Sequence, residues 1–297
     1  MVDRIKNKMK RREVYEKRKI QKEKEKQARR IQKKREAEEL GAEAPAKETP
    51  KTLDNTREGD ETVVEADDTE VLADEEEDEF AAYFDNSKIP KLMITTRPRP
   101  SSGLFAFISD LMTMIPNSFF YPRKEYSLEQ ISKWAHNKGF THLIVLGEKL
   151  KECNQMLVNH LPVGPSALFK VSNIKHQSKI RGHGNSTGHL PEIILNRFQT
   201  RVGHRVGRFL GSLFSHDPEF RGRNVVTFHN QRDFIFVRHH RYAFRDEGKK
   251  AQLQELGPRF TLKLKWLMAD SFDSEHGEYE WVHKRGEMDT SRRRFAL

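Results

Sequence analysis

The sequence predicts a mixed α/β (α+β) protein whose folded part consists of two similar halves, preceded by a basic helical arm and a disordered acidic linker. Three observations support this prediction: charge is segregated into blocks, strand and helix patterns alternate from residue 88, and the alternation partly restarts near residue 190. The expected segments are the arm at 1–40, the acidic linker at 41–87, the folded domain at 88–270 (halves 88–175 and 189–270, joined by a linker at 176–188), and a C-terminal extension with a basic tail at 271–297.

Composition limits the class of protein. Of the 297 residues, 33% are charged and 35% are hydrophobic, which is too polar a mixture for a compact fold throughout. The net charge of +10 favours an anionic partner. The single cysteine, Cys153, excludes an internal disulfide and a cysteine-based zinc site. No apolar run approaches the roughly 18 residues that a membrane span needs, so no membrane partner is expected.

The basic arm is predicted to be one helix. Residues 1–35 carry 17 basic and 5 acidic residues, contain no Pro or Gly, and include the favourable i,i+4 pair of Glu13 and Lys17. Apolar residues are too sparse there to form a core stripe. The arm is either a solvated charged helix or, as we favour, a segment that contacts RNA and carries nuclear-targeting clusters. The first such cluster is Lys10, Arg11 and Arg12.

The acidic linker is expected to be disordered by composition, since residues 58–79 contain thirteen acids and no base. It would act either as a solubilising tether or as an electrostatic decoy that competes with RNA for basic surfaces. The aromatic cluster at 80–84 that follows is either a docking motif or the first packed turn of the folded domain.

Within the first half, the pattern predicts an alternating series of strands and helices. Ser102 is expected to begin an amphipathic helix, and Ser127 with Gln130 forms a capping box for a second one that Gly139 closes. The expected strands are 91–96, 117–121, 141–146, 155–161 and 167–171, and the first helix is expected over 102–114.

The second half repeats this series in part. The segment 89–97 matches 190–198 in type, with an aliphatic residue, Pro, a charged residue and three apolar residues, and an amphipathic helix follows both. A Gly-Pro pair precedes the strand at 167–171 and also the strand around Leu262–Leu264. A hairpin is predicted over 225–244, with its turn at 230–233.

The best candidate surface for anions is the helix expected over 201–214. Three glycines beginning at Gly203 recur at spacing four, and each costs a helix roughly 1 kcal/mol relative to alanine. Close approach of RNA or of a packed strand would compensate for that cost. We expect phosphate binding, and the alternative is an ordinary amphipathic helix with solvated arginines. Opposite its apolar face the helix carries Arg201, His204, Arg205 and Arg208.

Further RNA-contact candidates lie in loops and at strand ends. Arginines beside aromatic residues suit phosphate contact combined with base stacking. The alternative for the aromatic residues of the hairpin is a place in the core. The candidates are Arg97 and Arg99, Arg197, Arg221 and Arg223, Arg238, His239, Arg241 and Tyr242 in the hairpin, and Arg259.

Catalytic patterns are weak. The segment 181–188 superficially resembles a phosphate loop, but it lacks the Gly-Lys-[Ser/Thr] ending and lies in a predicted linker. His239 and His240 should point to opposite faces of a strand, which is poor geometry for sharing a metal. No catalytic residue, metal or cofactor is therefore expected. An RNA-processing enzyme such as a nuclease, and a chromatin-binding factor with a basic arm, are the two alternatives to an RNA-binding scaffold.

Several motifs in order along the chain resemble those of one family, the Brix-domain family. A segment after the first strand, 95–98, resembles the family's opening. The other similar blocks are His160–Phe169, Phe198–Arg208, Asn224–Arg238 and Glu255–Leu262, so that the resemblance covers about residues 88–270.

This resemblance implies a two-half fold, each half similar to the anticodon-binding domain of certain aminoacyl-tRNA synthetases. It implies a nucleolar, non-catalytic factor that binds rRNA beside a dedicated assembly-factor protein partner in a pre-ribosomal particle. The C-terminal segments 272–283 and 292–295 are similar to the branch of the family that serves the large ribosomal subunit, so the expected ligand is large-subunit precursor rRNA. The site residues rest mainly on charge placement.

Overall fold

The computed structural model describes residues 7–40, 50–52, 55–59, 61–64, 68–246, 248–271, 277–288, 290–291 and 293–297, and it divides into two units, Met1–Thr52 and Leu53–Leu297. In the first unit, residues Lys8–Leu40 form helix α1. The Nζ atom of Lys17 lies 2.6 Å from Glu13 Oε1, as the i,i+4 spacing predicted. The apolar side chains of Met9 and Ile20 are 80% and 54% exposed. The helical arm is confirmed, and it has no core of its own within the described residues.

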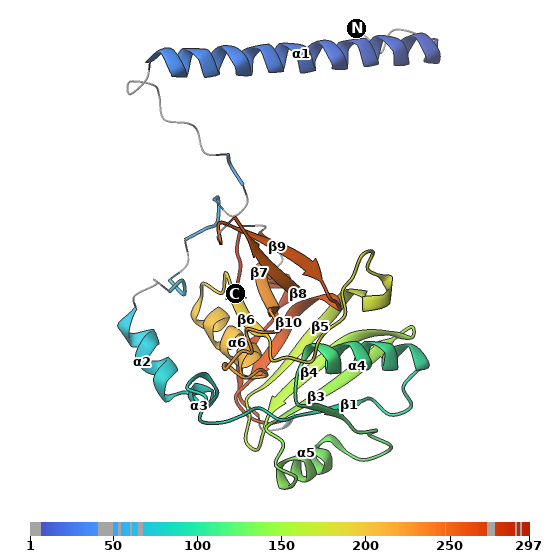
Figure 1. Ribbon diagram of the computed structural model, residues 1–297, viewed down its shortest axis with the longest axis vertical. Coiled ribbons are helices and arrows are strands. Elements are labelled where there is room, and N and C mark those ends of the chain that lie inside the picture. Colours follow the sequence, from blue (N-terminus) through green and yellow to red (C-terminus); the bar gives the residue numbers. More distant parts are fainter. Residues whose placement is uncertain are drawn as a thin grey trace. The chain divides into compact units, whose positions relative to one another are not determined.

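The second unit is built on one continuous mixed sheet, with eleven strands among the described residues (Figure 1). The strand order is β2-β1-β3-β4-β5-β10-β8-β7-β6, with β11 beside β10 and β9 beside β8. The strands are β1 (Leu92–Thr96), β2 (Ser118–Phe120), β3 (His142–Lys149), β4 (Glu152–His160), β5 (Ser166–Lys175), β6 (Glu192–Asn196), β7 (Asn224–Gln231), β8 (Phe234–Arg245), β9 (Lys250–Glu255), β10 (Arg259–Met268) and β11 (Tyr279–Val282).

Parallel pairing begins each predicted half. Strand β1 is parallel to β2 and β3, and β6 is parallel to β7, whereas the remaining pairs are antiparallel. Antiparallel pairing of β5 with β10, in the middle of the sheet, joins the strands of the first predicted half to those of the second. This order agrees with the mixed α/β fold predicted from the sequence, while the duplication of the halves stays a prediction. The helices of this unit are α2 (Thr69–Glu77), α3 (Ala81–Phe84), α4 (Ser102–Met114), α5 (Leu128–Asn137), the 3-10 turn η3 (Gln177–Lys179), α6 (Arg201–Gly211) and α7 (Arg285–Met288).

Local sequence signals explain two of these helices. Helix α4 has the bounds that the apolar spacing predicted. Helix α5 begins at the predicted capping box, where Ser127 Oγ accepts from the Gln130 amide at 3.2 Å and Gln130 Oε1 accepts from the Ser127 amide at 3.1 Å.

The two faces of the sheet are covered differently. The inner face packs on α4 and α6 in one hydrophobic cluster, where for example Phe107 of α4 meets Phe260 of β10 with ring centroids 5.3 Å apart. On the outer face, Ile131 and Ala135 of α5 pack on Met93 of β1 and its neighbours on β3. Strands β1 and β3 therefore lie between α4 and α5 (Figure 1).

The expectation of a disordered acidic linker is wrong for residues 68–87. Helices α2 and α3 form there and lie beside α6 (Figure 1). Phe80 and Tyr83 are fully buried, and the Phe80 ring stacks on Phe209 of α6 with centroids 5.3 Å apart. Tyr83 Oη lies 3.0 Å from His160 Nε2 at the end of β4. The aromatic cluster is therefore a packed turn of the domain. The predicted linker residues 41–49, 53–54, 60 and 65–67 lie outside the described residues.

The predicted linker at 176–188 also packs on the sheet. Ile180 is 4% exposed, and the amide of Gly184 donates to the Glu255 carbonyl at 2.9 Å. Strands β9 and β11 were not predicted.

Candidate nucleic-acid interface

Helix α6 forms where the amphipathic pattern predicted it. Thr200 caps its first turn, since its Oγ1 accepts from the Gly203 amide at 2.8 Å. The glycines leave room for other parts of this chain. A β-carbon at Gly207 would lie 3.3 Å from the Phe198 ring, and one at Gly211 would lie 2.9 Å from the Phe84 ring. Close packing within the protein therefore accounts for these glycines, without a contact to RNA.

Arg208, predicted to bind RNA, is neutralised within the chain. Its Nε and Nη2 donate to Asp78 Oδ2 and Oδ1 at 2.5 and 2.7 Å, and its guanidinium lies 4.3 Å from the Phe84 ring centroid. The two side chains are only 12% and 11% exposed. A buried arginine with a bidentate carboxylate has no free edge for a phosphate.

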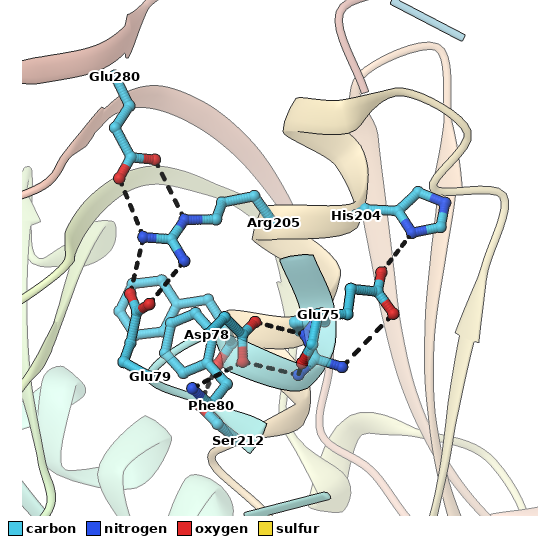
Figure 2. A network of polar contacts seen from close by, with 10 residues as sticks. Glu75, Asp78, Glu79, Phe80, His204, Arg205, Ser212 and Glu280 are labelled. Carbon is cyan, nitrogen blue, oxygen red and sulfur yellow. Dashed lines mark hydrogen bonds and ion pairs between the residues drawn. The ribbon is translucent and has the colours of Figure 1, made fainter. Parts of the chain in front are cut away.

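Arg205 is held in the same way. It lies 2.7 Å from Glu79 and 3.0 Å from Glu280, and its guanidinium lies 5.4 Å from the Phe80 ring (Figure 2). Burial alone would lower the pKa of Arg205, but the hydrogen bonds and charges of the two carboxylates outweigh it and raise that pKa. Arg205 and Arg208 are thus paired with carboxylates of the same chain, and their contact with RNA stays a prediction.

The other two cations of α6 meet the acidic helix α2 nearer the solvent. Arg201 Nη2 lies 2.8 Å from Glu70 Oε2, with side chains 53% and 69% exposed. His204 Nδ1 lies 2.7 Å from Glu75 Oε1 (Figure 2). The whole predicted basic face of α6 is thus matched by carboxylates, and the competition with RNA stays a prediction. The most buried of these pairs, that of Arg208 with Asp78, is part of the packing between α6 and the segment that precedes α3.

A second basic surface lies on the outer face of the sheet, beyond the reach of α5. Among the described residues, neither hydrophobic cluster includes a side chain of this face on β7, β8 or β10. Thr227 pairs with Arg238, and Thr261 pairs with Phe236 and with Ser172, so these side chains point to one side. We call this surface the open sheet face; around the buried Thr261 it consists of Lys170, Ser172, Thr227, His229, Phe234, Phe236, Arg238, His240, Arg259 and Lys263.

Cations and aromatic rings interleave on the open sheet face. The Arg238 guanidinium lies 6.0 Å from the Phe236 ring, and Lys263 Nζ lies 5.3 Å from the Phe234 ring. Burial, and then the charge of Arg259, lower the pKa of Arg238. Two arginines that repel one another favour an anion beside them. Phosphate contact by the cations and base stacking on the rings is the chemistry that such a surface can perform.

One hairpin candidate is wrong because its side chain is buried. His239 is 1% exposed, its Nδ1 lies 3.0 Å from the Gly257 carbonyl oxygen, and burial lowers its pKa to about 4. A neutral, buried imidazole cannot contact RNA. His240 lies on the open sheet face instead, opposite Val225, as strand alternation predicted.

The other three candidates lie on different sides of the sheet. Arg241 pairs with Asn224 on the side of β8 opposite the open sheet face, whereas Tyr242 and Arg259 lie on the side of the open sheet face. Tyr242 hydrogen-bonds to Glu192, which raises the pKa of the tyrosine. Arg241 donates to the Asn185 carbonyl at 3.4 Å. Arg259 Nε lies 2.9 Å from Glu255 Oε1, and it therefore shares its charge with one carboxylate.

The other predicted residues are dispersed. Arg97 Nε lies 3.7 Å from the buried Glu148, and the 90% exposed side chain of Arg99 lies 3.8 Å from Glu125. Arg197, Arg221 and Arg223 are exposed in loops beside β6 and β7, and Lys10, Arg11 and Arg12 are exposed on α1. Sequence reasoning missed Phe236 and Lys263, although strand alternation from Arg238 would have placed Phe236 beside it.

Other kinds of site find little support. Within the described ranges, no group of three or more His, Cys, Asp or Glu side chains is placed to hold a metal ion. No helix in the described part of the chain combines the length and apolarity needed to cross a membrane. The segment 181–188 follows η3 as an irregular stretch rather than a strand–helix turn.

The chain belongs to the Brix-domain family, whose model matches residues 98–266. A protein named ribosome production factor 1 from Pongo abelii is 50% identical over 297 residues, covering 100% of this chain and 85% of its own length. A Brix domain-containing protein of Caenorhabditis elegans is 52% identical over 260 residues, covering 88% of this chain and 68% of its own. One from Schizosaccharomyces pombe is 43% identical over 256 residues, covering 84% and 83%.

Proposed function

We propose that this protein is a non-catalytic assembly factor that binds precursor rRNA of the large ribosomal subunit in the nucleolus. Membership of the family and 50% identity over the chain to a protein named ribosome production factor 1 support a role in ribosome production. The observation that carries the RNA-binding part is the open sheet face, where cations and aromatic rings interleave on a surface without a described covering helix.

In this proposal the open sheet face contacts RNA in two ways. Arg238, Lys263 and Lys170 engage phosphates, and Phe234 and Phe236 offer ring faces to unstacked bases. Phe234 is 42% exposed, so its ring is accessible without rearrangement. Sheets that bind single-stranded RNA commonly use exposed aromatic residues in this way.

Helix α1 adds a second, less specific contact. Its described side chains are exposed, apart from the half-buried Val14, and it carries Lys10, Arg11 and Arg12 near its beginning. A run of cations on one helix attracts RNA by counterion release, without reading sequence. The arm would hold neighbouring RNA of the pre-ribosomal particle, while a dedicated protein partner occupies another surface of the folded unit.

A binding experiment tests this proposal. The full chain is titrated against a structured fragment of large-subunit precursor rRNA over a range of salt concentrations, with duplex DNA of equal length as competitor. The double variant Arg238→Gln/Lys263→Gln should bind at least about tenfold more weakly and lower the salt slope by about 2, since each phosphate contact contributes a slope of roughly 1. Arg245→Gln, an exposed change on the same strand, is the matched control.

Four outcomes would contradict the proposal. An affinity that does not change with salt concentration would exclude phosphate contacts as the source of binding. Equal loss in the double variant and in the control would show that net charge alone drives binding. Preference for the duplex DNA would favour a chromatin-binding factor, and magnesium-dependent cleavage of the RNA that a point mutation abolishes would favour a nuclease.

A further inference from the structure

A separate cleft lies between helix α5 and the segment that follows β2. It has a volume of about 350 Å³. Its floor is formed by buried side chains of β1 and α5, namely Met93, Thr95 and Ile131. Its walls are three aromatic residues that are each at least 39% exposed. We call it the aromatic cleft; its walls are Tyr121, Tyr126 and Trp134.

Hydrogen bonds hold the backbone that carries the walls of the aromatic cleft, and two of its rings contact each other. Thr95 Oγ1 donates to the Tyr121 carbonyl at 2.8 Å, and Arg123 Nε donates to the Tyr126 carbonyl at 3.0 Å. The Tyr126 and Trp134 rings meet edge to face, with centroids 4.7 Å apart and an interplanar angle of 80°. The rings are therefore ordered before a ligand binds, so that binding does not cost the free energy of arranging them.

The charge at the rim is positive. Arg123, Lys124 and Lys138 line the aromatic cleft, and no carboxylate is among its described lining residues. Lys138 Nζ lies 5.3 Å from the Tyr121 ring centroid, so that a cation and an aromatic face are offered side by side. This pairing fits a ligand that has both a flat apolar part and a negative charge.

The position of the cleft adds a second argument. Met93 and Thr95 lie on the outer face of β1, the side of the sheet that also carries the open sheet face. One strand of RNA that leaves the open sheet face can therefore continue on the same side of the molecule toward the cleft.

From these observations we propose that the aromatic cleft captures one unstacked base of single-stranded RNA, with the flanking phosphates on Arg123, Lys124 and Lys138. The inference rests on the proposed RNA-binding function and adds to it a second contact, made with a single unpaired base. Stacking on such rings tolerates any base, because every base has a π-face. The cleft would thus recognise an unpaired nucleotide rather than a particular sequence.

Binding of a single-stranded uridine octamer to the full chain tests the inference. Trp134→Leu should weaken binding of the octamer by about tenfold, as loss of one stacked base predicts, without changing the affinity for a fully paired duplex. The intrinsic fluorescence of Trp134, followed in a chain carrying Trp266→Phe and Trp281→Phe, should be quenched on adding the octamer. Lys138→Gln should weaken binding of the octamer, and Lys133→Gln, an exposed change on the same helix, should not.

The outcomes separate this inference from the proposed function. If Trp134→Leu and Lys138→Gln leave the affinity for the octamer unchanged while Arg238→Gln weakens binding, the proposed base capture by the aromatic cleft is wrong. RNA binding by the open sheet face would then still hold. No binding of the octamer, together with no effect of Arg238→Gln on structured RNA, would overturn both. A thermal melt of each variant detects loss of fold, and Lys138→Gln keeps the test valid if Trp134→Leu unfolds, because Lys138 is exposed.

Discussion

Replacing Phe80 with alanine should lower the free energy of unfolding by about 3–5 kcal/mol, the usual cost of removing a buried phenylalanine. The side chain is 0% exposed. It stacks on Phe209 with ring centroids 5.3 Å apart and meets the edge of His160 at 5.7 Å. The aromatic contacts account for roughly 0.5–1.5 kcal/mol of the loss, and burial and the cavity account for the rest.

The assay is urea denaturation of the full chain, followed by intrinsic fluorescence, with Leu72→Ala as the control. Leu72 lies on the acidic helix α2 and is 51% exposed, so its replacement should change stability by no more than about 0.5 kcal/mol. A loss of less than about 1 kcal/mol for Phe80→Ala would refute the reasoning, because it would mean that residues 80–84 are not part of the core.

Three further predictions follow from contacts of the same unit. Asp78→Asn should destabilise the chain by about 3–5 kcal/mol because it leaves Arg208 buried without its carboxylate, whereas Glu70→Gln, which breaks an exposed pair, should cost at most about 1 kcal/mol in the same denaturation assay. Burial lowers the pKa of His239 to about 4, so between pH 6.5 and pH 4 the unfolded chain binds this proton more readily than the folded chain. Lowering the pH from 7 to 5 should therefore reduce the free energy of unfolding by about 2 kcal/mol through this residue. His239→Gln should flatten that pH dependence. Burial raises the pKa of the Cys153 thiol to about 12, so iodoacetamide should alkylate Cys153 only in denaturant, and rapid alkylation of the folded chain would contradict its burial.

Much of the fold could be predicted because its signals are local. The capping box at Ser127 and the apolar spacing of α4 each lie within one turn or one helix, and both elements form where expected. The alternation of His239 and His240 between two faces of β8 follows from strand geometry alone.

The acidic segment 68–87 was wrongly expected to be disordered, because its overall composition hides the few apolar residues that pack. Phe80 and Tyr83 are few among many carboxylates, yet each is fully buried, and two buried rings are enough to order the short helix that carries them. The order of α2 then follows, since Val71 is buried and Asp68 caps the helix by accepting from the Glu70 amide at 3.1 Å.

The candidate site could be predicted only in part. A helical projection put Arg205 and Arg208 on one exposed face, but the carboxylate that neutralises Arg208 lies 130 residues away in the sequence. The hairpin pattern did place Arg238 among aromatic residues. Which face of the sheet stays open depends on where α5 packs, and that is a property of the tertiary structure rather than of the hairpin.

Ultraviolet cross-linking of the tagged chain in cells, followed by sequencing of the attached RNA, tests the central claim most directly. The account predicts a few sharp peaks in large-subunit precursor rRNA, which the Arg238→Gln/Lys263→Gln variant loses while Arg245→Gln keeps them. Peaks in small-subunit RNA would contradict the assignment to the large subunit. Diffuse signal over many RNAs, unchanged in the double variant, would contradict specific binding by the open sheet face.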